Sequence, residues 1–245
     1  MKSKPTIPLR EKAVALCGAL TLAYTAWGFG GVLAWSLHIM LAGGLLTFAL
    51  AVFPFPRRSK SGSFQLSAFS FQLLKTPAFY FAAAFLAYLA LAALNPAWRI
   101  ASDERGWWLE SVAPPPAAWL PTSVEAAYEP MNAWRIFHMH LAAFSLAMGL
   151  YLGLASRRAM RFVLWTFLVS VSGMALVGIL QKYLHAEAVL WSLPSENVNF
   201  WGSFFYRNQG AAFLNWGIVI AGLLYFLHAR RSRERSEERR VGKEC

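Results

Sequence analysis

The chain has 245 residues, of which 57% are hydrophobic, 16% aromatic and only 14% charged. This composition is too apolar for an ordinary soluble domain and indicates a membrane protein. The net charge of +11 would also suit a nucleic-acid-binding protein. Such a protein gathers its basic residues on one face, whereas here they form short clusters between apolar runs, so we expect no nucleic-acid partner.

The first apolar stretch lies between Lys12 and Arg57 and contains no charged residue. Its 44 residues, 13–56, would form roughly 66 Å of helix, which is twice the thickness of a bilayer core of about 30 Å. Two spans are therefore required. The glycines of residues 28–31 allow the tight turn between them.

Four more apolar stretches follow, separated by polar connectors. The sequence therefore predicts an all-α fold, a polytopic bundle of about six transmembrane helices within a transmembrane domain of residues 13–231. The spans are predicted near residues 13–28, 32–53, 77–94, 135–155, 162–181 and 208–228. The connectors are a polar segment at 57–75 that suits the membrane surface, a long loop at 95–134, a basic turn at 156–161 and a loop at 182–207.

Charge is distributed unevenly between the two sides of this arrangement. Basic clusters in residues 1–12, 57–75, 156–161 and 230–231 all fall on one side. The acidic residues on the other side are Asp103, Glu104, Glu110, Glu125, Glu129, Glu187 and Glu196. Because basic residues are enriched in cytoplasmic loops, we expect residues 1–12 and the C-terminus to be inside, and the two long loops to be outside. The tryptophans of these loops are typical of the headgroup level, and they are Trp98, Trp107, Trp108, Trp119, Trp134, Trp191 and Trp201.

The final residues differ from the rest of the chain in composition. The segment "ERSEERRVGKEC", residues 234–245, is charged and low in complexity. It resembles a vector-derived sequence appended to a reading frame that runs off an assembled fragment. We therefore expect residues 234–245 to be non-native and the natural chain to continue with further spans.

A polar cluster opens the sixth predicted span, in the stretch "GSFFYRNQGAAFL" at residues 202–214. With the preceding span and loop, this stretch resembles the O-antigen ligase and O-antigen polymerase-like membrane glycosyltransferases. In that family a span ending in Gly and Gln leads through an outer loop to Gly-Ser/Thr-Phe, an Arg-Asn pair and a helix of small residues. The matching residues are Gly178, Gln181, Gly202, Ser203, Phe204, Tyr206, Arg207, Asn208, Ala211 and Leu214. The "FGGV" at 29–32 and the "NPAW" at 95–98 also look like that family, and the resemblance covers most of residues 11–231.

The resemblance implies a metal-independent transfer that uses no cofactor, on the periplasmic face of the bacterial inner membrane. The donor would be a polyprenyl-diphosphate-linked glycan, and the acceptor a lipid-linked or growing saccharide. The residues expected to bind the lipid diphosphate, among surrounding membrane lipids, are Tyr206, Arg207, Asn208, Gln209, Gln181, Lys182 and Arg135. Structural roles in the motif are expected for Gly202, Ser203, Phe204 and Gly210. The family's catalytic histidine and a further arginine belong to a large outer loop that no segment here matches, so this piece is expected to be inactive alone.

The side chains of this polar cluster suit diphosphate binding, but they also suit a purely structural role. A guanidinium offers a planar fork of donors that matches phosphate oxygens, and a helix N-terminus favours an anion. Alternatively, Arg207 reaches to lipid headgroups while Asn208 caps the helix, and Arg135 and Lys182 anchor their own spans. The same two roles, binding the diphosphate and anchoring its own span, are open to Gln181.

The remaining polar residues carry weaker signals. The loop acids suit either a general base or a solvated loop, and they are Asp103, Glu104 and Glu110. His138 and His140 cannot chelate one ion together, because positions i and i+2 of a helix point roughly 200° apart. A transporter or permease fragment and a non-catalytic membrane scaffold are the alternative functions. The position of the polar cluster at the outer edge, rather than at mid-membrane, counts against transport.

Overall fold

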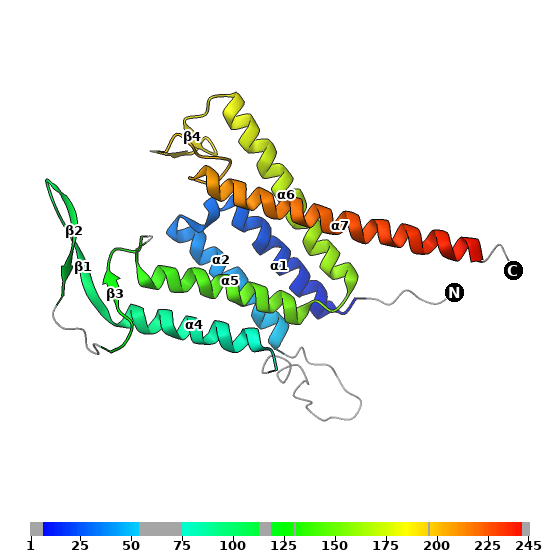
Figure 1. Ribbon diagram of the computed structural model, residues 1–245, viewed down its shortest axis with the longest axis horizontal. Coiled ribbons are helices and arrows are strands. Elements are labelled where there is room, and N and C mark those ends of the chain that lie inside the picture. Colours follow the sequence, from blue (N-terminus) through cyan, green and yellow to red (C-terminus); the bar gives the residue numbers. More distant parts are fainter. Residues whose placement is uncertain (1–6, 54–74, 113–118, 130, 196, 242–245) are drawn as a thin grey trace. The chain divides into compact units, whose positions relative to one another are not determined.

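The computed structural model describes residues 7–53, 75–112, 119–129, 131–195 and 197–241, the last eleven by their backbone alone. Within these ranges the chain is mostly helical, with two small sheets (Figure 1). The elements are α1 (Leu9–Trp27), η1 (Phe29–Gly31), α2 (Ala34–Val52), α4 (Pro77–Leu94), β1 (Pro96–Asp103), β2 (Gly106–Ser111), β3 (Ser123–Glu125), α5 (Ala133–Gly153), α6 (Arg157–Tyr183), β4 (Ala188–Val189), β5 (Leu193–Pro194) and α7 (Arg207–Val241).

The chain divides into two compact units, which are described separately. The first unit comprises Met1–Thr21 and Gly31–Ser156. The second unit comprises Leu22–Gly30 and Arg157–Cys245. The helix α1 contributes to both units, because the division falls within it.

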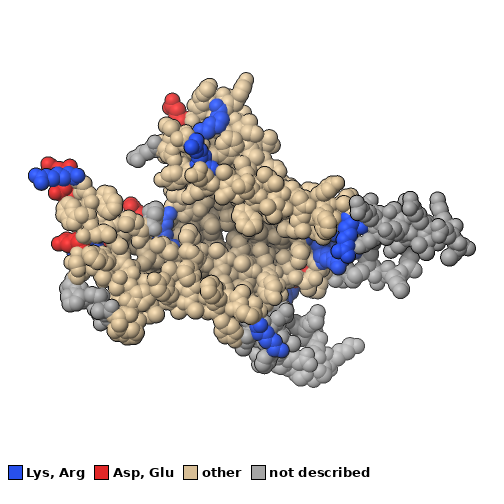
Figure 2. All heavy atoms as spheres, viewed as in Figure 1, with Lys and Arg blue, Asp and Glu red and all other residues tan. Residues whose placement is uncertain are grey.

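Five helices among the described residues are long and apolar enough to cross a membrane. They are α2, α4, α5, α6 and the part of α7 from Arg207 to Arg230. Many of their large apolar side chains are exposed, including Phe81, Val169 and Ile218. On the face shown in Figure 2, charged side chains lie at the ends of helices and on the loops, while the middle of the helices carries none. This pattern is expected where lipid is the solvent.

The helix α1 covers the first predicted span but begins with charge. Its first turn contains Arg10, Glu11 and Lys12. The 15 residues that follow, 13–27, would rise only about 22 Å, less than a bilayer core of about 30 Å. α1 is therefore a helix at the predicted position that does not by itself meet the length of a span.

The break after α1 falls in the predicted glycine segment. Phe29, Gly30 and Gly31 have φ values of 57°, 61° and 75°. Glycine adopts this left-handed region without the steric cost that a Cβ carries. Two glycines in succession therefore allow the chain to leave α1 and begin α2 within a few residues.

Two predictions about connectors are wrong, and one lies outside the described residues. The basic segment 156–161, predicted as a turn, forms the first turn of α6 from Arg157 onward. The segment 95–134, predicted as a long loop of an all-α fold, contains the strands β1, β2 and β3. The predicted surface segment 57–75 lies outside the described residues, except for Lys75 at its end.

In the first unit, α2 and α5 pack closely because glycines lie at their contact. A Cβ added at Gly149 would lie 2.7 Å from the backbone nitrogen of Phe48. A Cβ added at Gly44 would lie 2.6 Å from the carbonyl oxygen of Ala142. Neither backbone atom can move away as a side chain can. Small residues at both positions are therefore required for this close approach, as in other membrane helix pairs.

The first turn of α1 ties the ends of α2 and α5 together. Arg10 donates a hydrogen bond to the carbonyl oxygen of Ala51 in α2. Glu11, which is only 6% exposed, accepts hydrogen bonds from the backbone N–H groups of Ala155 and Ser156. Those two amides follow the last residues of α5. The charges that shorten the apolar part of α1 therefore have a structural role.

Replacing Glu11 by alanine is expected to lower the free energy of unfolding by about 2 kcal/mol, because two part-buried backbone hydrogen bonds to this side chain are lost. Denaturation of the purified protein in detergent measures this change. Glu104→Ala, at an exposed position of the β1–β2 turn, is the control and should change the stability by less than about 0.5 kcal/mol. Equal stabilities of the two variants would contradict the assignment.

The small sheet of the first unit has the order β2-β1-β3. β1 and β2 are antiparallel, with Ile100 opposite Leu109 and Ser102 opposite Trp107. β3 runs parallel to β1. Asn95, which is buried, joins the sheet to α4, because its carbonyl accepts from the Ser123 amide and its side chain donates to the Pro121 carbonyl at 3.2 Å. The sheet is thus attached directly to the end of a candidate span.

Candidate functional site

In the second unit, the stretch before α7 folds into a two-residue hairpin turn. Trp201 and Phe204 exchange two backbone hydrogen bonds of 2.9 Å each, with Gly202 and Ser203 between them. Gly202 has a φ of 59°, whereas Ser203 has no positive φ. A positive φ at the first central residue alone is the backbone of a type II′ turn, which favours glycine at that position. The first glycine of the motif is therefore required by the turn.

The turn is held on both sides by buried contacts. Ser203 is fully buried, and its hydroxyl donates to the carbonyl oxygen of Ala26. Its backbone N–H points to the sulfur of Met174 at 3.3 Å. Phe204 packs with Ala26 and Met174 in the core of this unit, next to Phe213 of α7. The Ser-Phe pair of the motif thus attaches the loop to the end of α1 and to α6.

Trp201 fills the space between α6 and α7. A Cβ added at Gly178 of α6 would lie 2.3 Å from its indole ring, and one added at Gly210 of α7 would lie 3.1 Å from it. Gly210, for which a structural role was predicted, therefore leaves room for this ring, and so does Gly178. The indole Nε1 atom is buried, and the described residues offer it no hydrogen-bond partner.

Four polar side chains follow the turn at the start of α7. Tyr206, Arg207, Asn208 and Gln209 are all exposed, and α7 begins at Arg207. The backbone amides of Arg207, Gln209 and Gly210 already donate to carbonyls of the loop. Of the first four backbone amides of α7, only that of Asn208 donates no backbone hydrogen bond within the described part of the chain. An anion here would therefore depend on side chains more than on the free amides predicted from sequence.

Two further predicted residues lie at the end of α6 and differ in their access to solvent. The Lys182 side chain is exposed, donates to the Val198 carbonyl at 3.2 Å and lies 5.0 Å from the centre of the Phe200 ring. Gln181 is 1% exposed, and its amide nitrogen is 3.4 Å from the Ala188 carbonyl. Lys182 is thus a cation held on the surface of the loop, whereas Gln181 is enclosed beneath it.

The last predicted residue, Arg135, belongs to the first unit. Its guanidinium donates to the carbonyl of Val32 and lies 3.5 Å from that of Gly31, so it fixes the start of the chain that leads into α2. Asn132 caps α5 through the Arg135 amide at 3.0 Å. Arg135 therefore has structural partners of its own.

The first unit contains a cluster of aromatic and histidine side chains that was not predicted from the sequence. The Tyr128 hydroxyl lies 2.7 Å from Nδ1 of His138, and the His38 ring stacks on the Tyr128 ring with centroids 5.4 Å apart. Burial raises the pKa of the Tyr128 hydroxyl, and the positive charge of Arg135 opposes that rise. His140 points elsewhere, packing on Phe85, as the i, i+2 spacing predicts.

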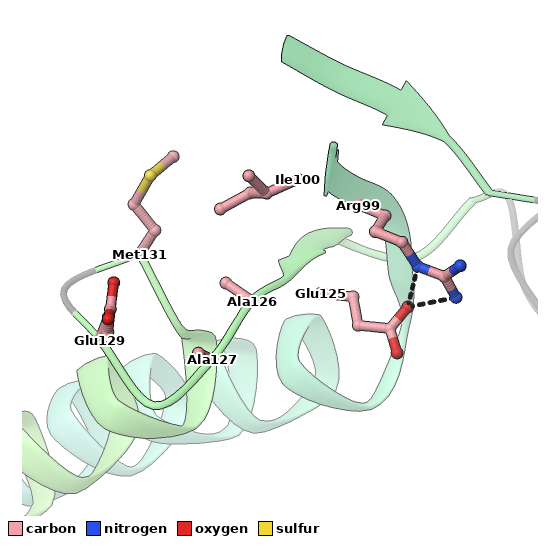
Figure 3. Close-up of a pocket in the computed structure, with 7 residues that line it drawn as sticks. All are labelled: Arg99, Ile100, Glu125, Ala126, Ala127, Glu129 and Met131. Atoms are coloured by element: carbon pink, nitrogen blue, oxygen red, sulfur yellow. Dashed lines mark hydrogen bonds and ion pairs between the residues drawn. The ribbon is translucent and has the colours of Figure 1, made fainter. Parts of the chain in front are cut away.

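Two acidic residues of the first loop, Glu125 and Glu129, line an open hollow of about 760 Å³ beside β1 (Figure 3). Arg99 pairs with Glu125 at 2.9 Å on one side of the strand, whereas Ile100 points to the other side, toward Met131. Asp103 accepts from the Arg105 amide within the β1–β2 turn. No group of three metal-ligating side chains occurs in the residues that the structure describes. These acids are solvated, and none is aimed at a buried partner.

Comparison with protein-family models, with curated protein sequences and with solved structures gives no match for this chain. The geometry alone then defines the site. It is a largely buried turn at residues 201–204 that is followed by the exposed Tyr206, Arg207, Asn208 and Gln209 at the start of an apolar helix. Lys182, at the end of α6, donates to the Val198 carbonyl of the loop that leads to this turn. Such a set can donate several hydrogen bonds to an anion at a membrane surface.

Proposed function

We propose that this chain forms part of a membrane glycan ligase or polymerase, and that residues 206–209 bind the diphosphate of a polyprenyl-linked saccharide donor. Transfer would take place on the periplasmic face of the bacterial inner membrane, onto a lipid-linked or saccharide acceptor. The observation that carries the proposal is the exposed Arg207 at the start of a candidate span, three residues after a turn in which Gly202, Ser203 and Phe204 are buried.

Three properties of the site support this proposal. A polyprenyl diphosphate carries its charge at the boundary between an apolar tail and water, and the first turn of α7 is also the boundary between an apolar helix and a polar loop. Arg207 is a cation, and no acidic residue lies in the segment 197–210 around it. The buried Ser203 and Phe204 fix the backbone, so little ordering is needed on binding.

Arg207→Lys is expected to weaken the binding of undecaprenyl diphosphate about tenfold, because the charge remains while the bidentate fork is lost. Arg207→Ala should weaken it further. The measurement is a titration of the purified chain in lipid nanodiscs, which needs no catalytic loop. Undecaprenol, which has the same tail without phosphates, gives the binding due to the tail alone.

Arg105→Lys is the matched control, since Arg105 is an exposed arginine at the β1–β2 turn. It should bind undecaprenyl diphosphate with unchanged affinity. Equal affinities for the diphosphate and for undecaprenol would overturn the proposal, and unchanged binding by both Arg207 variants would leave Arg207 as an anchor for headgroups.

A further inference from the structure

The β1–β2 hairpin has one apolar face and one charged face. Opposite residues of an antiparallel pair point to the same side of a sheet, and successive residues alternate. The register therefore puts Trp98, Ile100, Leu109 and Trp107 on one face, with Ser102 and Ser111. The other face carries Arg99 opposite Glu110, together with Ala101, Asp103 and Trp108. Figure 3 shows this alternation at Arg99 and Ile100, which point to opposite sides of β1.

Among the described residues of the first unit, the apolar face of the hairpin is largely exposed. Trp107 is 66% exposed, and Trp98 and Leu109 are each 43% exposed. All six residues of β2 are exposed. The charged face, by contrast, is stabilised within the chain by the Arg99–Glu125 ion pair. An exposed surface of two indoles and two aliphatic side chains in a small sheet calls for an apolar partner.

The apolar face is continuous with two candidate membrane spans. β1 begins at Pro96, two residues after the end of α4 at Leu94, and the buried Asn95 makes this joint rigid. Ile100 points toward Met131, which is 45% exposed and lies two residues before α5 (Figure 3). The hairpin turns across the end of α4 instead of continuing along its axis (Figure 1). A segment so placed stays near the level at which α4 ends.

We propose that the apolar face of the β1–β2 hairpin rests in the interfacial layer of the same bilayer that α4 and α5 cross. This layer extends roughly 5–8 Å beyond each side of the hydrocarbon core, and tryptophan is enriched in it. The side chains Trp98, Ile100, Leu109 and Trp107 take the lipid side, while Arg99, Glu110 and Glu125 take the water side. Aliphatic residues between the tryptophans favour acyl chains over a glycan, which needs hydrogen-bonding groups between stacking rings.

The test is spin labelling of the full chain in phosphatidylcholine and phosphatidylglycerol nanodiscs, with Cys17 and Cys245 replaced by serine. Single cysteines are introduced by Ser102→Cys and Ser111→Cys on the apolar face and by Ala101→Cys and Glu110→Cys on the charged face. These sites leave every tryptophan in place. The measured quantity is the ratio of the collision rate with oxygen to the collision rate with a water-soluble nickel chelate. This ratio is expected to be several-fold higher for labels at 102 and 111 than for labels at 101 and 110.

A second pair of variants identifies the side chains responsible. In the Ser102→Cys background, Trp107→Ser should reduce the preference of the label for oxygen, whereas Trp108→Ser, on the opposite face, should not. Four labels with equal access to the nickel chelate would overturn the proposal. Labels at 102 and 111 protected from both reagents would overturn it as well, since a protein or glycan would then cover the face.

Discussion

Gly149→Ala is expected to lower the free energy of unfolding by about 2–3 kcal/mol, although alanine is the better helix former by about 1 kcal/mol. The added Cβ would lie 2.7 Å from the Phe48 nitrogen, 2.8 Å from the Thr47 carbonyl carbon and 2.9 Å from the Phe48 Cα atom. All three are backbone atoms, so relief requires α2 and α5 to separate. Separation would also disturb Met148 and Leu152, which are buried in the core formed with Val14 and Ala51.

The matched control is Gly222→Ala, in the apolar part of α7. A Cβ at this position would meet no atom within 4 Å. The same substitution should therefore leave the stability unchanged or raise it by up to about 1 kcal/mol through helix propensity. Opposite signs for the two variants, measured by denaturation in one detergent, would support the close packing of α2 and α5. Equal values would mean that the helices lie farther apart than the structure shows.

The positions of the helices could be predicted because charge and hydropathy change sharply along this chain. The third predicted span, 77–94, has the same bounds as α4, and the other four predicted spans from 32–53 onward overlap their helices within a few residues. The exception shows the limit of this reasoning. Arg157, Arg158 and Arg161 were assigned to a turn, but charge marks the edge of a bilayer and not the end of a helix, so α6 continues through them.

The sheet of the first loop could not be predicted from hydropathy, because it depends on pairing across the chain. β3 pairs with β1 through Pro96 and Ser123, and proline-rich sequence separates the strands. A local signal was nevertheless present. Two short segments that contain aromatic and branched apolar residues, 98–100 and 107–109, flank the polar residues 102–105 and Gly106, which is a signal for a β-hairpin.

In the candidate site, the resemblance named a segment but gave no physical reason for its residues. Gly178, Gly202 and Gly210 were assigned from a resemblance, and the structure gives each a steric role. Gln181 was expected beside the ligand, yet it is enclosed. A motif therefore names residues together, whereas burial separates the enclosed ones, such as Gln181, from those accessible to solvent, such as Arg207.

Trp201→Ala is expected to cost about 3 kcal/mol, because it removes the ring that separates α6 from α7 and leaves a cavity between Gly178 and Gly210. Trp201→Phe should cost much less. It keeps most of the ring and removes an indole N–H that has no partner among the described residues. Trp119→Ala is the control, since that side chain is 85% exposed. Hydrogen exchange of residues 197–210 should rise in Trp201→Ala and not in Trp119→Ala.

A double-mutant cycle with Gly178 distinguishes this packing from a general loss of stability. Gly178→Ala alone should destabilise the protein, because its Cβ would lie 2.3 Å from the indole of Trp201. In the Trp201→Ala background the same Cβ enters the vacated space, so its cost should fall to near zero or change sign. Additive effects would show that Trp201 does not fill this gap. Coupled effects, with weakened undecaprenyl diphosphate binding by Trp201→Ala, would show that the packing beneath the loop positions Arg207.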